Sequence, residues 1–505
     1  MTNKDLVYLV NAGNDGGIAS ASNDHSFPAL SVLALGTWLH NRMPDVEVVA
    51  RDGGVKTNNG IKEEISKLNP VIVGVSALCT SYQNSLDLAK TAKGLGAKVV
   101  FGNDQASQTS RLILENQPDV DYVIGAEYGE LPLELLVKHI RGNNVPLDKI
   151  PSLTYRKDGQ IQGFDFNNSA HKAALSITSP FSGYNEIILE NGLRTGRRDV
   201  LDIFPIVDRN LYPKDHWDAY LKNYLGKFSG LHKQPVLGVT TMNRARGCNR
   251  QGSAKCKHCD MLLDISSSSP QMFWEEVKAA HGQVKATSFY ETCDSFSSFP
   301  GLIKKIAEAK PSNLGFNPEF YVYAQAVDLA DHPERVDMLK EIGVFRANMG
   351  LESMNNSTLR HMKGENDSVE KNYRALQLLK DKGIHVYGSF VLGSEVETPE
   401  TLKETKERAC DLIRGGYLCD AEAQPVMPLH GNYQGDVMKR HGLMHGDSLH
   451  LDWPINVEDL SEVYIDRFSG VTHAQCVEAV KEIRDCAKRC GINHCSVFSR
   501  EDSYK

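Results

Sequence analysis

Short apolar runs alternate with amphipathic stretches along the first 145 residues. The apolar runs predict strands at 6–10, 46–50, 71–78, 98–101 and 122–124. Between them apolar residues recur every three or four positions, which predicts helices at 29–41, 62–68, 82–95, 107–115 and 131–141. Strands that alternate with helices pair in parallel, so we expect a doubly wound, Rossmann-like α/β domain over residues 1–145.

A second alternating region starts near residue 231. Its apolar runs predict strands at 236–241, 287–291, 313–317, 347–351, 386–392 and 421–426. Six strand–helix units are too few for an eight-stranded barrel of roughly 250 residues, so we predict a partial (β/α)6, TIM-like barrel over 231–430.

The other two segments are less regular. Residues 146–230 are expected to be a connector, with a hairpin at 152–162 around Asp158-Gly159. Residues 431–505 predict a mainly helical C-terminal domain. Its cysteines favour either helix packing or an auxiliary metal site, and they are Cys476, Cys486, Cys490 and Cys495.

Polar and glycine-rich turns follow the predicted strands of the first domain. Parallel sheets bind ligands beyond the carboxyl ends of their strands, so these turns form a candidate cofactor site. The candidate residues are Ser76, Gly102, Asn103, Gly125 and Glu127. Such turns also suit a nucleotide, a flavin or no ligand at all.

Three cysteines, Cys248, Cys256 and Cys259, follow the first strand of the second region. Structural zinc sites use four protein ligands, whereas three thiolates on an iron–sulfur cluster leave one iron open for a substrate. We therefore predict a metal site for chemistry at this loop. A zinc ion with His258 as its fourth ligand is the alternative.

Composition narrows the classes of partner. The net charge is −8 over 505 residues, with Lys and Arg scattered along the chain, so we expect no nucleic-acid partner. No apolar run reaches the length of a membrane span and no signal peptide is recognisable, which predicts a cytoplasmic protein without a membrane partner. Eleven cysteines in such a protein favour metal or redox use over disulfides.

The Cys-x7-Cys-x2-Cys loop resembles the cluster-binding loop of radical S-adenosylmethionine (SAM) enzymes, whose commoner spacing is Cys-x3-Cys-x2-Cys. Four further segments resemble strand ends of the same superfamily, at 291–296, 349–363, 388–398 and, more weakly, 424–431. The first domain, with Phe101-Gly-Asn-Asp and Gly125-Ala-Glu-Tyr-Gly-Glu, resembles the cobalamin-binding domain of class B type radical SAM methyltransferases. The Asp-x-His-x-x-Gly signature of other cobalamin proteins is absent, so a histidine is not expected below the cobalt.

The resemblance implies cofactors and residue roles. The three cysteines would bind a 4Fe-4S cluster, and SAM would chelate its open iron and be cleaved reductively to a 5'-deoxyadenosyl radical. Polar groups for the methionine and ribose parts of SAM would come from Glu291, Glu352 and Ser353, while Gly393 would allow adenine to approach closely. The cobalamin would lie on the first domain.

The function implied is methylation of an unactivated carbon in a small molecule or peptide by a cobalamin-dependent radical SAM enzyme. A one-electron donor such as flavodoxin or ferredoxin would serve it. Two alternatives stay open, a cobalamin-binding enzyme that rearranges or oxidises its substrate without methylation, and a noncatalytic corrinoid or cluster sensor. The sequence assigns no catalytic residue of the protein itself.

Overall fold

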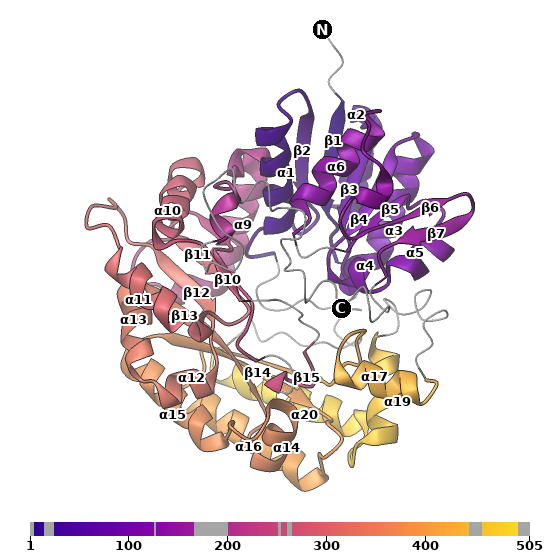
Figure 1. The fold of residues 1–505 in the computed structure, drawn as a ribbon. Coiled ribbons are helices and arrows are strands. Elements are labelled where there is room, and N and C mark those ends of the chain that lie inside the picture. The colour runs from indigo at the N-terminus through magenta and orange to yellow at the C-terminus, as the bar shows by residue number, and fades with distance from the viewer. Residues whose placement is uncertain are drawn as a thin grey trace.

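The computed structural model describes residues 5–14, 25–125, 128–165, 200–250, 254–259, 265–443 and 457–492. Two of the sequence candidates, Glu127 and Cys495, lie outside this part of the chain. Figure 1 shows the first sheet with its helices beside the second sheet, and the C-terminal helices beyond β15. Within the described residues, no helix is both long enough and apolar enough to span a membrane.

The first sheet has seven strands in the order β2-β1-β3-β4-β5-β6-β7. Neighbouring strands from β2 to β5 are parallel, and β6 and β7 add antiparallel pairs. The strands are β1 (Leu6–Asn11), β2 (Glu47–Asp52), β3 (Ile72–Ser76), β4 (Lys98–Gly102), β5 (Tyr122–Ile124), β6 (Leu153–Lys157) and β7 (Gln160–Gly163). The helices are α1 (Leu30–Arg42), α2 (Asn58–Leu68), α3 (Tyr82–Gly94), α4 (Asp104–Gln108), α5 (Ser110–Asn116) and α6 (Glu130–Ile140).

Every strand and helix predicted for the first domain is present, with the helix expected at 107–115 divided into α4 and α5. The strand order reverses direction between β1 and β3, the kind of point at which open parallel sheets bind ligands. The predicted hairpin is also present, but it pairs with β5 through Val123 and Thr154. The first sheet therefore extends beyond residue 145, into the segment expected to be a connector.

The second sheet has six parallel strands in the order β15-β14-β13-β12-β11-β8. Its strands are β8 (Val239–Met242), β11 (Ser288–Glu291), β12 (Glu319–Tyr323), β13 (Val344–Glu352), β14 (His385–Leu392) and β15 (Asp420–Pro425). Strands that pair in chain order, each followed by helices, agree with the predicted (β/α)6 pattern. The strand predicted at 313–317 is wrong, because Gly315 has a φ of +77° there and the strand forms at the aromatic run six residues later.

Helices accompany each strand of this region. They are α9 (Lys214–Phe228) before β8, then α10 (Pro270–Val284), α11 (Pro300–Glu308), α12 (Ala326–Asp331), α13 (Glu334–Ile342), α14 (Asn356–Lys363), α15 (Val369–Asp381) and α16 (Pro399–Arg414). A short antiparallel pair, β9 (Ala245–Arg246) and β10 (Ser266–Ser267), follows β8.

The described part of the C-terminal region is helical, as α17 (Tyr433–Arg440), α19 (Val457–Phe468) and α20 (His473–Arg489). These helices share one apolar core with the second sheet, which includes Ile465, Cys476 and Cys486. Both cysteines are buried in this core, whereas Cys490 is exposed. The C-terminal helices are therefore part of the barrel domain's core.

Candidate cluster and cofactor site

The cysteine loop begins directly beyond the carboxyl end of β8. The two-residue strands β9 and β10 pair at its base, with Arg246 opposite Ser266, so both ends of the loop are fixed. Cys248, Cys256 and Cys259 all lie between these strands. A turn joins the last two, where the Cys259 N–H donates to the Cys256 carbonyl at 3.1 Å.

Helices from later in the chain contact the middle of this loop. The Lys257 N–H donates to the carbonyl of Met362 on α14 at 2.9 Å, and the Tyr433 N–H of α17 donates to the Lys257 carbonyl at 3.0 Å. The Lys257 ammonium also lies 3.1 Å from the His361 ring nitrogens. Backbone bonds on both sides of Lys257 thus position the segment between the second and third cysteines.

The charges around the loop suit an anionic group. Burial raises the pKa of the Cys248 and Cys256 thiols, while the cations Lys363 and Arg250 act in the opposite direction on Cys256. A cluster bound by three thiolates carries net negative charge, and nearby cations stabilise it. The donor set and its neighbours therefore fit an iron–sulfur cluster.

Among the described residues, no group of three or more His, Cys, Asp or Glu side chains is arranged to hold a single metal ion. A zinc ion would need all of its ligands around one point, whereas the three thiolates of a 4Fe-4S cluster each bind a different iron.

Glu352 reaches the cysteine loop from the carboxyl end of β13. Its φ of +56° is rare outside glycine, and the register of β13 with β14 shifts between Gly350 and Glu352. The carboxylate consequently lies over Gly350, where an added Cβ would be 2.1 Å from Oε1. Its Oε1 is 3.5 Å from His258 Nε2 and 3.7 Å from Lys363 Nζ. Backbone strain of this kind is typical of functional sites.

Glu291, at the end of β11, is fully buried below the loop. The Arg244 N–H donates to its two carboxylate oxygens at 3.1 and 3.2 Å. Burial raises the pKa of Glu291 to about 8, against the lowering effect of backbone N–H groups from Arg244 and Ala245. In this structure Glu291 therefore positions the chain that leads into the cysteine loop, and its contact with SAM stays a prediction.

Ser353 and Gly393 face other parts of the protein. The Ser353 hydroxyl is hydrogen-bonded to Thr405 of α16 at 2.9 Å, on the helix side of the sheet. Gly393 has a φ of +91°, and a Cβ there would lie 2.6 Å from Ile465 Cδ1 and 3.1 Å from Cys476 Sγ. The missing side chain therefore makes room for α19 and α20, and binding of SAM by either residue stays a prediction.

In the first domain, β3 and β4 bring two candidates together. The Asn103 amide, at a φ of +84°, donates to the Ser76 hydroxyl at 2.9 Å. Next to them, a Cβ on Gly102 would meet, among the described residues, the Ile124 carbonyl at 3.8 Å. Gly125 lies apart and packs against Phe164, where a Cβ would be 3.0 Å from the ring.

The end of the first sheet contacts the base of the cysteine loop. The Tyr128 hydroxyl, just after β5, is hydrogen-bonded to Ser266 of β10 at 2.9 Å. The Arg246 guanidinium lies 4.4 Å from the centre of the Tyr128 ring. These contacts place the candidate cofactor edge of the first domain beside the candidate cluster loop.

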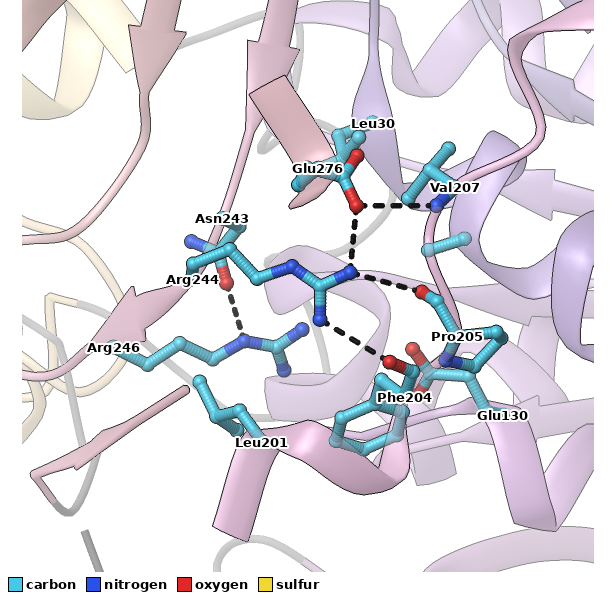
Figure 2. Close-up of a pocket in the computed structure, with 11 residues that line it drawn as sticks. Leu30, Glu130, Leu201, Phe204, Pro205, Val207, Asn243, Arg244, Arg246 and Glu276 are labelled. Carbon is cyan, nitrogen blue, oxygen red and sulfur yellow. Dashed lines mark hydrogen bonds and ion pairs between the residues drawn. The ribbon is translucent and has the colours of Figure 1, made fainter. Parts of the chain in front are cut away.

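A buried ion-pair network lies along the same interface, and Figure 2 shows the part of it formed by Glu276 and Arg244. Glu276 of α10 pairs with Arg209 and with Arg244, each at 2.6 Å, and all three side chains are nearly inaccessible. Burial alone would raise the pKa of Glu276, but the two arginines lower it overall. Arg244 also donates to the carbonyls of Phe204 and Pro205, so the network joins α10, the connector and the start of the cysteine loop.

Sequence reasoning missed the neighbours of Cys248. Gln325, beyond β12, donates its amide N–H to Cys248 Sγ at 3.3 Å, and the Arg250 N–H approaches the same sulfur at 3.5 Å. Arg250 lies inside the cysteine motif, so its sequence position could have indicated that it is near the cysteines. No sequence feature indicated Gln325, because the strand before it was expected at 313–317.

Comparison with known proteins agrees with this geometry. Residues 242–409 match the Radical SAM superfamily. An anaerobic magnesium-protoporphyrin IX monomethyl ester cyclase from Rubrivivax gelatinosus is 32% identical over 358 residues, which cover 70% of this chain and 56% of the cyclase. The chain thus spans little more than half the length of that relative.

Two solved structures share the fold. One is the radical SAM methyltransferase TsrM from Kitasatospora setae with cobalamin and a [4Fe-4S] cluster bound, with a TM-score of 0.61, 16% identity, and coverage of 87% of this chain and 78% of TsrM. The other is the cobalamin-dependent SAM radical enzyme OxsB, with a TM-score of 0.56, 17% identity, and coverage of 96% of this chain and 61% of OxsB. Residues 242–409 thus carry a match to the Radical SAM superfamily, within a fold that the chain shares with TsrM and OxsB.

Proposed function

We propose that this chain is a cobalamin-dependent radical SAM enzyme that methylates an unactivated carbon of a small molecule or peptide. The observation that carries the proposal is the three-cysteine loop at the carboxyl end of β8, in contact with the first domain through Tyr128 and Ser266. When bound, the cluster supplies the electron that cleaves SAM, and cobalamin supplies the methyl group.

The protein residues in this proposal bind and orient. Cys248, Cys256 and Cys259 bind the cluster. Glu352, directed at the loop by its positive φ, accepts hydrogen bonds from the ammonium group of SAM, while Ser76 and Asn103 bind the corrin ring at the sheet edge beside Gly102. A reduced flavodoxin or ferredoxin is the proposed electron donor.

An aromatic wall supports radical chemistry, since a reactive radical must be shielded from water. The Tyr290 hydroxyl donates to the Tyr323 hydroxyl at 2.6 Å, and the Tyr290 ring stacks on the Tyr321 ring with their centres 4.8 Å apart. The ring of Phe27, from the first domain, has its centre 5.1 Å from that of Tyr290. Both domains thus contribute to an apolar wall around the end of β11.

The similarity to a protein named as a cyclase favours a second candidate, a rearrangement or oxidation without methyl transfer. Protein purified and reconstituted without oxygen should contain iron, acid-labile sulfide and corrinoid. With dithionite and SAM labelled in its methyl group, it should form 5'-deoxyadenosine. Label in the product supports methylation, and 5'-deoxyadenosine with an unlabelled, altered substrate supports the second candidate. Tight cofactor binding without either product would favour a noncatalytic sensor.

A further inference from the structure

Gln325 lies between β12 and α12 and contacts the sulfur of the first cysteine. Its side-chain Nε2 is 3.3 Å from Cys248 Sγ, within the range of an N–H···S hydrogen bond. The residue is 8% exposed, so water competes weakly for the amide. The backbone N–H of Gln325 donates to Ser297 Oγ at 2.9 Å, and this bond holds the backbone from which the side chain extends.

The orientation of the amide follows from its other neighbours. Arg250, whose guanidinium can only donate, contacts Gln325 Oε1. Arg250 is itself fixed by Asp367 at 2.5 Å and by the Lys363 carbonyl at 2.6 Å. Because Arg250 must contact the oxygen, the NH2 group of Gln325 must face Cys248.

Among the residues that the structure describes, four acceptors lie within hydrogen-bond distance of this NH2 group, which has two protons. Besides the sulfur they are Asn249 Oδ1 at 2.9 Å, Ser295 Oγ at 3.0 Å and Ser298 Oγ at 2.9 Å. The other three are neutral oxygens, whereas a cluster-bound thiolate is anionic and gains electron density on reduction. Hydrogen bonds to charged acceptors are stronger than those to neutral ones. On reduction of the cluster, the bond to sulfur is therefore strengthened more than the bonds to the three oxygens.

We infer that Gln325 is a positioning residue that raises the reduction potential of the cluster through a hydrogen bond to Cys248. This inference rests on the proposed function. Hydrogen bonds to cluster sulfurs stabilise the reduced state, which carries the additional negative charge. The protein would thereby make its cluster easier for a one-electron donor to reduce.

The test compares midpoint potentials measured by EPR during anaerobic redox titration of the reconstituted full chain. Gln325→Leu removes the donor at similar volume, and Gln325→Glu places a carboxylate beside the sulfur. We expect the potential to fall in the order wild type, Gln325→Leu, Gln325→Glu. At a fixed applied potential, the ratio of reduced to oxidised cluster should drop roughly fivefold in Gln325→Leu, the effect of one hydrogen bond.

Ser298→Ala is the matched control, because it removes another partner of the same amide and leaves the bond to sulfur. Its potential should not fall below that of wild type. If wild type and both Gln325 variants have equal potentials and full iron content, the inferred effect of the Gln325 hydrogen bond is wrong. The proposed function is not affected by that result. A wild-type chain that binds no iron after reconstitution would instead overturn the proposed function and this inference with it.

Discussion

The carboxylate of Glu352 lies 3.5 Å from Nε2 of His258, so the end of β13 faces the cysteine loop between its second and third cysteines. Glu352 also lies 3.7 Å from Lys363 Nζ, and, besides burial, its charge raises the pKa of the Cys256 thiol.

Glu352→Gln should weaken SAM binding and leave the cluster in place. The amide oxygen of the variant can still accept a hydrogen bond but lacks the negative charge, which is worth about 1 kcal/mol, so the Kd for SAM should rise roughly fivefold. Equilibrium binding of SAM to the reconstituted variant measures this, with iron content as the control. Unchanged affinity would remove Glu352 from the binding site.

Cys256→Ala should abolish cluster binding without unfolding the chain, since the thiol stands on a loop outside the apolar core. Iron and sulfide analysis after reconstitution checks the first point, and circular dichroism the second. Cys490→Ala, at an exposed cysteine of α20's end, should bind iron as wild type does. Equal iron in both variants would contradict the assignment of the loop.

Glu291 should make the apoprotein less stable as the pH rises. Burial raises its folded-state pKa from 4.5 to about 8, so its stabilising protonated form is fully present below pH 4.5 and is lost as the pH rises towards 8. Glu291→Gln has no proton to lose. The Tm of wild type minus that of the variant should therefore decrease between pH 5 and pH 8, and a constant difference would show that Glu291 is ionised throughout.

Glu276→Ala should destabilise the protein strongly, because it leaves Arg209 and Arg244 buried without their common partner. Breaking a buried ion pair costs about 3–5 kcal/mol. Glu308→Ala is the control, since its pair with Lys304 is more than half exposed and should contribute less than about 1 kcal/mol. The midpoints of urea unfolding compare the two, and equal shifts would argue against the network at the domain interface.

The apolar pattern predicted most of the fold because its signals are local. All five strands and the helices of the first domain could be read from the sequence, as could five of the six barrel strands. The remaining strand was misplaced because Leu314 and Phe316 resemble half of an alternating run, although the continuous run Phe-Tyr-Val-Tyr, 320–323, forms β12. That error concealed Gln325, two residues beyond the true strand.

The candidate site was less predictable because it depends on side-chain direction and on distant neighbours. Ser353 follows Glu352 directly, so at a strand end the two point to opposite sides, and the bulge at Gly350 directs Glu352 to the loop. Gly393 meets Ile465 and Cys476, contacts that only the folded C-terminal helices provide. Sequence position alone indicates neither relationship.

The hydrogen bond from Tyr433 to the Lys257 carbonyl has a consequence for biosynthesis. The ribosome synthesises the cysteine loop roughly 180 residues before Tyr433. At ordinary elongation rates the interval between the two is about 10 to 35 s. During that interval the nascent loop has its thiols but lacks its last backbone support. Metal loading before translation is complete would therefore act on a looser loop than loading afterwards.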